Sequence, residues 1–333
     1  MKKISIVVPC FNEQEVLPVY YEKMNEIMRQ MKNVEFQLVF IDDGSVDDTL
    51  PVLRELSQKD SRCVYLSFTR NFGKEAALYA GMQYADGDYI AVMDVDLQDP
   101  PELLPVMYAE LEKGEYDCIA SRRIDRKGEK RIRSFLSAMF YKIINRISKV
   151  NFVEGARDFR MMKRKMVDSV LLMSECNRFS KGMFSWVGFK TKWLEYHNIE
   201  RAAGKTKWSL RKLLNYSLDG ILDFSILPLS LSSYGGLFLC GISFFIVCFL
   251  VLQYLLWHDS VEGWTTLMCA IFFIGGVQLL CVGILGQYLA RTYMEVKKRP
   301  IYLLKEIWQN EKENNMQKIN NPYVYDNYKG KGR

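Results

Sequence analysis

Two long stretches without any charged side chain dominate the last third of this 333-residue chain. No Asp, Glu, Lys or Arg occurs between Asp223 and Asp259, a run of 35 residues, or between Glu262 and Arg291, a run of 28 residues. Roughly 20 apolar residues in a helix cross the hydrocarbon core of a bilayer, and both runs are longer than that. We therefore predict two transmembrane helices within residues 231–290, arranged as a hairpin, and exclude a purely soluble protein.

Basic residues flank the two runs on one side of the predicted membrane. Those before the first run and after the second are Lys205, Lys207, Arg211, Lys212, Arg291, Lys297, Lys298 and Arg299. The link between the runs carries only the acidic charges Asp259 and Glu262. Since cytoplasmic loops hold the excess of Lys and Arg, we expect a multi-pass protein with both termini in the cytoplasm. The apolar core of residues 1–9 is too short for a cleavable signal peptide.

Several common site patterns are absent from the sequence. The eight cysteines show no CxxC spacing, so we interpret them as small apolar filler rather than as zinc ligands or disulfide partners. Neither GxGxxG nor GxxxxGK[ST] occurs, which excludes a dinucleotide fingerprint and a P-loop.

The first 125 residues alternate short apolar runs with segments of helical periodicity. Five runs rich in β-branched and aromatic residues predict strands at Ile4–Pro9, Phe36–Ile41, Cys63–Phe68, Tyr89–Asp94 and Asp117–Ser121. Strands that are apolar throughout and separated by amphipathic helices are typical of a parallel sheet covered on both faces. We therefore expect an α/β fold with a doubly wound, mostly parallel sheet, in a cytoplasmic domain of residues 1–205.

Acidic side chains follow three of the predicted strands where each strand ends. These segments are Cys10-Phe11-Asn12-Glu13, Asp42-Asp43-Gly44-Ser45 and Asp94-Val95-Asp96-Leu97-Gln98. Each alone is compatible with a solvated turn or helix cap. Several carboxylates at one sheet edge repel one another, however, unless a cation or a polar ligand lies among them. The oxygen atoms of Asp94, Asp96 and Gln98 suit Mg²⁺ or Mn²⁺ bridging a diphosphate, so we expect one of these metals as the cofactor.

Six short motifs stand out along the chain in a fixed order. They are Pro9-Cys10-Phe11-Asn12-Glu13, Asp42-Asp43-Gly44-Ser45, Arg70-Asn71-Phe72-Gly73-Lys74, Asp94-Val95-Asp96-Leu97-Gln98-Asp99-Pro100-Pro101, Asp158-Phe159-Arg160 and Arg299-Pro300-Ile301-Tyr302. Together they resemble the motifs of family 2 inverting glycosyltransferases. Within that family they resemble the bacterial polyprenyl-phosphate (bactoprenol) glucosyltransferases, which are related to dolichol-phosphate mannose synthase. The resemblance runs from about residue 3 to residue 302 and implies a GT-A type transferase fold in the bacterial cell membrane.

The resemblance implies which residues would bind the donor nucleotide. Pro9, Phe11, Glu13 and Asp42 would line the uridine end of a UDP-sugar, and Lys74 would lie beside this pocket. Phe11 stands where the family has Tyr, a departure that keeps the aromatic ring.

The resemblance also assigns residues to the donor phosphates. Asp94 and Asp96 would hold the diphosphate through the metal, with Gln98 as a further ligand. Arg201 and Lys205 match a mobile loop that closes over these phosphates in relatives. Both would stabilise the leaving UDP.

The implied acceptor is undecaprenyl phosphate. Arg122 and Arg133 match basic positions that face the acceptor phosphate, and Asp158 matches an aspartate near it, where it would orient the acceptor or act as a base. The implied reaction transfers a hexose with inversion, for cell-envelope glycan modification, with glucose ahead of N-acetylglucosamine and galactose. Because the second pKa of a phosphate is about 6, this nucleophile needs no strong general base at neutral pH.

A basic segment follows the fifth predicted strand. Residues 120–150 carry ten Lys or Arg against two acidic residues, a balance of +8 that exceeds the +6 of the whole chain. Its apolar residues between Leu136 and Ile147 repeat at helical spacing, so we interpret it as a helix on an anionic membrane surface. The alternative is a helix packed on the sheet with solvated basic flanks. Two membrane spans argue against nucleic acid as a partner.

The remaining segments flank the predicted hairpin. Residues 206–230 form a second amphipathic stretch, which we interpret as an interfacial linker leading into the first span. Residues 291–333 are expected to form a cytoplasmic return, with a disordered tail from Asn310 onward.

Two other functions fit part of this pattern. A processive polysaccharide synthase would share the donor site, but Cys176–Phe179 lacks the Gln and Trp of the Gln-x-x-Arg-Trp pattern of such enzymes. A catalytically silent membrane scaffold would have lost its carboxylates, whereas Asp94, Asp96 and Asp158 are intact. The oligomeric state, including a homo-oligomer, stays open.

Overall fold

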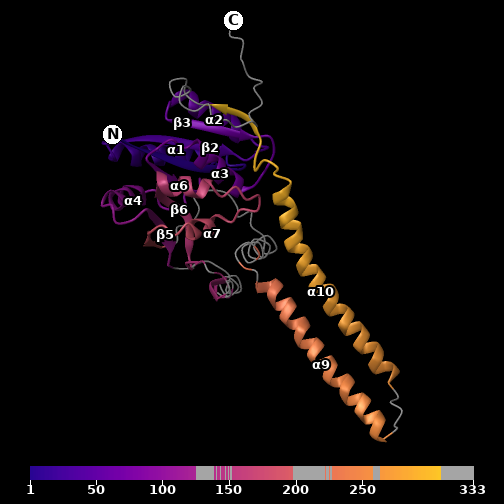
Figure 1. The fold of residues 1–333 in the computed structure, drawn as a ribbon. Coiled ribbons are helices and arrows are strands. Elements are labelled where there is room, and N and C mark those ends of the chain that lie inside the picture. The colour runs from indigo at the N-terminus through magenta and orange to yellow at the C-terminus, as the bar shows by residue number, and fades with distance from the viewer. Residues whose placement is uncertain are drawn as a thin grey trace.

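The computed structural model describes residues 1–124, 152–197, 227–257 and 263–308, with short runs of one to three residues among 139–150 and single residues at 222 and 225. The described chain forms a domain built on one sheet and a long helical hairpin that projects from it (Figure 1). Most of the basic segment 120–150 and of the linker 206–230, and the tail from Asn310, lie outside the described residues. The interpretations placed on them therefore stay predictions.

One sheet forms the framework of the domain. Its strands are β1 (Lys2–Cys10), β2 (Val34–Asp42), β3 (Cys63–Phe68), β4 (Tyr89–Val92), β5 (Cys118–Arg123), β6 (Ala156–Lys163), β7 (Thr191–Tyr196) and β8 (Leu304–Trp308). Their order in the sheet is β7-β5-β6-β4-β1-β2-β3-β8. Neighbours are parallel from β4 through β1 and β2 to β3, whereas β6 is antiparallel to both β4 and β5, and β8 is antiparallel to β3. The expected mostly parallel sheet is confirmed.

Helices cover both faces of the sheet. Those of the domain are α1 (Leu17–Gln30), α2 (Thr49–Lys59), α3 (Lys74–Tyr84), α4 (Leu103–Glu112), α6 (Arg164–Leu171) and α7 (Ser180–Trp186). Side chains of α1, α2 and α4 pack in one apolar cluster, and those of α3, α6 and α7 pack in a second. Alternate residues of β1 serve the two faces, because Ile6 and Val8 lie in the first cluster and Val7 lies in the second. The doubly wound arrangement is therefore confirmed.

The helix α3 lies close against the sheet at Gly81, in its C-terminal half. A Cβ atom at Gly81 would lie 2.2 Å from Cγ1 of Val7, so only glycine allows this approach. The helix α3 begins at Lys74, directly after a glycine with φ of +97°. The close packing of α3 on the sheet therefore places Lys74 near the carboxyl ends of the strands.

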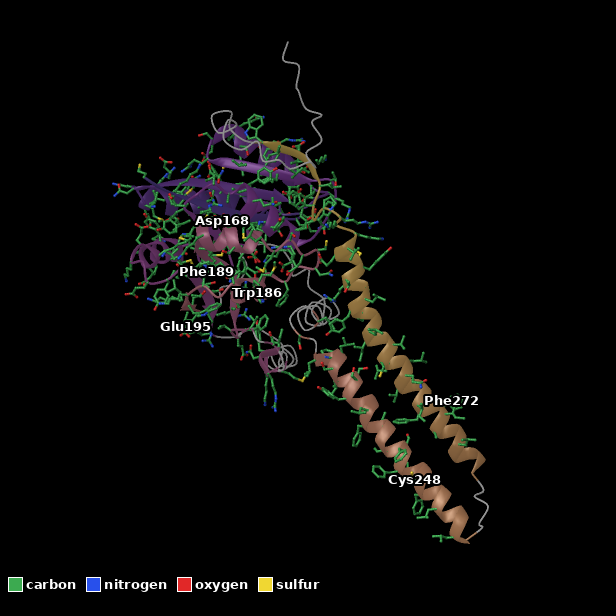
Figure 2. All side chains as sticks on the ribbon, in the orientation of Figure 1. Asp168, Trp186, Phe189, Glu195, Cys248 and Phe272 are labelled. Atoms are coloured by element: carbon green, nitrogen blue, oxygen red, sulfur yellow. The ribbon has the colours of Figure 1, made fainter. Side chains whose placement is uncertain are left out.

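The hairpin consists of α9 (Leu227–Trp257) and α10 (Trp264–Val296) (Figure 1). Both helices are long and apolar enough to cross a membrane. Their large apolar side chains face outward, as Figure 2 shows for Phe272, which is 78% exposed. Near the base of the hairpin, the Tyr288 hydroxyl donates a hydrogen bond to the carbonyl of Ser225 at 2.7 Å. The two helices expected within residues 231–290 are present, and each extends a few residues beyond these bounds.

The chain returns from α10 to the sheet. Glu295, near the end of α10, accepts a hydrogen bond from the backbone N–H of Cys176 at 2.7 Å. Beyond the helix, the ring of Tyr302 stacks on Phe68 with centroids 5.0 Å apart. The strand β8 then pairs with β3, and the C-terminal end of the hairpin is thus tied to the domain.

A bidentate ion pair joins β8 to α2. The Arg54 guanidinium of α2 contacts both carboxylate oxygens of Glu306, at 2.8 and 2.6 Å. The Tyr65 hydroxyl of β3 donates to the same carboxylate at 2.9 Å. This part of the segment 291–333 is therefore an ordered edge strand, which the sequence did not indicate.

Candidate functional site

The carboxyl ends of β1, β2 and β4 meet at one edge of the sheet, as the parallel register requires. The loop after β1 and the loop after β2 bind each other there. The Asn12 N–H donates to Oγ of Ser45, and the Val46 N–H donates to Oδ1 of Asn12, both at 2.9 Å. Asn12 has a φ of +55°, a conformation seldom adopted by residues other than glycine. Pro9, Phe11 and Glu13 are half-buried at or just after the end of β1, next to this paired rim, and their contact with a nucleotide stays a prediction.

Asp42 is buried beneath that rim. Its Oδ1 accepts a hydrogen bond from the Ser45 N–H at 2.9 Å, and its Oδ2 accepts one from Oγ of Ser67 at 2.7 Å. Both carboxylate oxygens therefore already have partners from the chain. Asp42 fixes the shape of the rim, while its predicted contact with a nucleotide stays a prediction.

Asp43 holds the segment that leads to Lys74. Its carboxylate accepts hydrogen bonds from the backbone N–H groups of Phe72 at 2.6 Å and Gly73 at 2.9 Å. Burial raises the pKa of Asp43 to about 6, although these two N–H groups act in the opposite direction. Asp43 was not among the predicted site residues, because an aspartate before glycine is common in turns.

Lys74 lies between two carboxylates of the predicted site. Its Nζ is 2.6 Å from Oδ1 of Asp94 on one side and 2.6 Å from Oδ2 of Asp158 on the other. Burial opposes the charged ammonium, yet Asp158 and Asp94 together hold the pKa of Lys74 well above its ordinary value. Three residues distant in sequence are thus brought together, and we call them the Lys74 cluster.

Asp158 carries its charge in spite of burial. Burial favours the protonated form, but the ammonium groups of Lys74 and Lys181 hold the pKa of Asp158 well below its usual range. Its other oxygen, Oδ1, is buried and has no hydrogen-bond partner within the described residues. A carboxylate of low pKa accepts protons poorly, so this geometry suits an orienting group better than a general base.

The segment after β4 carries the expected metal ligands. It has no regular secondary structure, and Leu97 has a φ of +54°, which is strained for a residue with a branched side chain. The Gln98 N–H donates to Oδ1 of Asp96 at 3.2 Å.

A complete protein cage for a metal does not occur here. Within the described residues, no three His, Cys, Asp or Glu side chains are grouped to hold a metal ion. Two carboxylates and one amide oxygen, from Asp94, Asp96 and Gln98, nevertheless fit Mg²⁺ or Mn²⁺, which usually take one or two carboxylates together with substrate phosphates. The donor set therefore fits a cation that binds with a diphosphate.

Glu75 follows Lys74 and contacts the start of α7. Its carboxylate accepts hydrogen bonds from the Ser180 N–H at 3.0 Å and from the Ser180 hydroxyl at 3.1 Å. Burial, with the nearby charge of Asp158, raises the pKa of Glu75 to about 7. This contact was not predictable from the sequence, because the two residues lie on separate helices.

The predicted acceptor-side residues are only partly described. The Arg122 guanidinium donates to the carbonyl of Glu154 at 3.0 Å and lies 3.6 Å from the Glu195 carboxylate. These partners are not members of the Lys74 cluster, and the predicted role of Arg122 at the acceptor stays a prediction. Arg133, Arg201 and Lys205 lie outside the described residues.

Comparisons with known proteins show the family to which the chain belongs. Residues 5–171 match the family model described as glycosyl transferase family 2. A prophage bactoprenol glucosyl transferase homolog of Escherichia coli is 43% identical over 305 residues, covering 92% of this chain and 99% of that protein. The prophage-derived bactoprenol glucosyl transferase of Shigella flexneri is also 43% identical, covering 91% of this chain and 98% of that protein.

One solved structure is similar to the domain. The crystal structure of glucosyl-3-phosphoglycerate synthase from Mycobacterium tuberculosis, in complex with Mn²⁺, UDP-glucose and phosphoglyceric acid, covers 66% of this chain. The match covers 78% of that chain, with a TM-score of 0.45 and 20% sequence identity.

The family match and the two relatives confirm the resemblance found in the sequence motifs. The relatives match nearly the whole chain, including the segment that forms the hairpin. The chain therefore belongs to glycosyl transferase family 2 and is a glycosyltransferase, similar over almost its whole length to bactoprenol glucosyl transferases.

Proposed function

We propose that this glycosyltransferase transfers glucose from a UDP-sugar to undecaprenyl phosphate, with inversion at the anomeric carbon. The observation that supports this reaction best is the Lys74 cluster at the sheet edge, in a chain 43% identical to proteins named bactoprenol glucosyl transferase. The products are a lipid-phosphate-linked sugar and UDP.

Mg²⁺ or Mn²⁺, held by Asp94, Asp96 and Gln98, would neutralise charge that develops on the leaving diphosphate. Pro9, Phe11 and the other residues of the paired rim bind the nucleotide, and Lys74 supplies a fixed positive charge beside Asp94. A preorganised charge of this kind stabilises the leaving group without reorganisation during the reaction.

The acceptor phosphate is the nucleophile in this proposal. Because a phosphate is largely ionised at neutral pH, the site needs to position it rather than deprotonate it. The depressed pKa of Asp158 supports an orienting role for this carboxylate. Arg122 and Arg133 would bind the acceptor phosphate, and Arg201 and Lys205 would close over the donor.

The hairpin would hold the domain at the bilayer, where the acceptor lipid resides. Its exposed apolar side chains support a transmembrane placement, and the pairing of β8 with β3 supports placing both ends of the hairpin on the same side. The excess of Lys and Arg at those ends favours the cytoplasmic side of a bacterial cell membrane.

The reaction can be tested with purified protein, undecaprenyl phosphate and a panel of labelled UDP-sugars. UDP-glucose should give labelled lipid, EDTA should abolish its formation, and Mg²⁺ or Mn²⁺ should restore it. Asp96→Asn should lower the rate about 10³-fold, a loss of about 4 kcal/mol of transition-state stabilisation. Asp168→Asn, an exposed site on α6 (Figure 2), is the matched control and should leave the rate unchanged. Full activity in EDTA, or no labelled lipid with any UDP-sugar, would contradict the proposal.

A second experiment separates the donor side from the acceptor side. Arg133→Ala should raise the apparent Michaelis constant for undecaprenyl phosphate about tenfold, since a charge-assisted hydrogen bond contributes roughly 1.5–3 kcal/mol. UDP binding, measured by calorimetry, should stay unchanged. Asp42→Ala should instead weaken UDP binding with little effect on lipid dependence. If Arg133→Ala leaves lipid dependence in detergent unaltered, Arg133 contacts the membrane surface rather than the substrate.

A further inference from the structure

A buried polar cluster lies next to the predicted metal-binding segment and has no part in the reaction described so far. It consists of Asp99, Arg157 on β6 and Tyr196 at the end of β7, and we call it the Asp99 cluster. The Arg157 Nε donates to Oδ1 of Asp99 at 3.1 Å, and the Tyr196 hydroxyl donates to the same oxygen. The Asp99 side chain is only 1% exposed, and burial raises its pKa.

Stability alone does not account for a carboxylate at this position. The second oxygen of Asp99, Oδ2, is buried and has no hydrogen-bond partner in the part of the chain that the structure describes. Removing such an ion pair in favour of apolar residues of similar volume is often neutral or stabilising. The Asp99 cluster therefore lowers the stability of the folded protein relative to an apolar contact at the same place.

A second nitrogen of the Arg157 guanidinium faces Gln98. Its Nη2 lies 3.4 Å from Oε1 of Gln98, one of the three predicted metal ligands. Arginine only donates hydrogen bonds, so this contact turns the amide oxygen, rather than the amide nitrogen, toward the guanidinium. A carbonyl oxygen has two lone pairs, and one of them is left for a cation.

Secondary structure does not fix the orientation of Gln98. The segment is irregular on both sides of this residue, and Leu97 just before it is in the left-handed region. The planar guanidinium of Arg157 is held through its Nε by Asp99, which in turn accepts a hydrogen bond from Tyr196, and it supplies the orientation that the backbone does not. Partners of this kind, which hold a metal ligand without touching the metal, commonly change metal affinity by 10- to 100-fold.

We propose that Arg157 is a positioning residue, which, anchored by Asp99 and Tyr196, orients Gln98 toward the divalent cation of the donor complex. This inference rests on the proposed function, since it requires a cation bound with the nucleotide. It also gives β6 two tasks, because Asp158, the next residue, contacts Lys74.

The test measures Mn²⁺ affinity in the presence of UDP, by electron paramagnetic resonance of free Mn²⁺, without sugar transfer. Arg157→Lys keeps the charge but loses the fork, and Tyr196→Phe removes only one hydroxyl. Both variants should bind Mn²⁺ about tenfold more weakly than the unmodified protein. Arg164→Lys is the matched control, since Arg164 donates to the carbonyls of Ala85 and Gly87 at the other end of β6, and its Mn²⁺ affinity should stay within about twofold.

A double-variant comparison separates positioning from general packing. If Arg157 acts through Gln98, Arg157→Lys combined with Gln98→Ala should bind Mn²⁺ no more weakly than Gln98→Ala alone. Losses of affinity that simply add, or unchanged Mn²⁺ affinity in Arg157→Lys and Tyr196→Phe, would overturn the inference and leave the proposed function standing. No binding of Mn²⁺ with UDP by the unmodified protein would overturn both.

Discussion

Replacing Lys74 by methionine would keep the apolar stem of the side chain and remove the ammonium group between Asp94 and Asp158. Each contact spans 2.6 Å, and at an effective dielectric constant of about 20 each is worth roughly 6 kcal/mol before desolvation. Unpairing a fully buried ion pair costs about 3–5 kcal/mol. Since the Lys74 side chain is 34% exposed, solvent screening lowers this figure, and we expect a loss of about 2 kcal/mol.

The measurement is the thermal unfolding of the purified protein in detergent at low salt, without divalent cations. A loss of about 2 kcal/mol corresponds to a fall of roughly 4–8 °C in the midpoint for a domain of this size. Lys59→Met is the control, because Lys59 pairs with Glu55 on the exposed face of α2, where such a pair contributes at most about 1 kcal/mol.

Two further outcomes follow from the same electrostatics. Adding Asp158→Asn to Lys74→Met should recover part of the lost stability, because one unpaired carboxylate is removed. Mg²⁺ should also stabilise Lys74→Met more than the unmodified protein, since a cation then replaces the ammonium beside Asp94. A midpoint for Lys74→Met equal to that of Lys59→Met would refute the reasoning.

Three more predictions concern topology, pH and backbone strain. In a cysteine-free background, a cysteine at Ser260 should react with an impermeant thiol reagent outside intact cells and one at Ser45 should not; the reverse pattern would contradict the orientation. The pKa of Glu75 is raised to about 7 in the folded protein, so its carboxyl binds a proton more readily there than in the unfolded chain. This proton binding stabilises the folded protein at low pH, and its contribution is lost as pH rises from about 4.5 to 7. Glu75→Gln should reduce the fall in the unfolding midpoint across this pH range. An unchanged dependence of the midpoint on pH would count against the raised pKa of Glu75. Gly44→Ala should destabilise by more than about 1 kcal/mol, because φ is +65° and the new Cβ would lie 2.3 Å from the Arg70 carbonyl carbon, whereas Gly114→Ala, with open space around it, should cost less in the same unfolding assay.

The sequence predicted the first five strands because each is a short apolar run between turn residues. β6 was missed because it contains Arg157, Asp158 and Arg160, which suggest a solvent-exposed segment. In the structure Arg160 is only 3% exposed, and its guanidinium lies 4.0 Å from the centre of the Phe184 ring. A charged residue that packs on an aromatic face cannot be told from a surface residue by sequence pattern alone.

The site was predictable to the extent that its residues follow strands. Asp94 and Lys74 lie in short motifs that follow β4 and β3, and the parallel sheet places the carboxyl ends of these strands at one edge. Asp43, Glu75 and Arg157 were not assigned, because each acts by holding another segment through contacts that depend on tertiary packing. The motif containing Tyr302 was noted without a role, and the structure shows it stacked on Phe68.

The edge strand β8 can pair with β3 only late in synthesis of the chain. Tyr65 on β3 and its partner Glu306 on β8 are 241 residues apart in sequence, so the β3 edge stays open while the hairpin is made. An open apolar edge strand invites pairing with other chains. In a chain that inserts as proposed, β8 returns to the side of the membrane that holds β3 only after both spans have inserted. A chain with one span inserted would keep its β3 edge exposed to pairing with other chains.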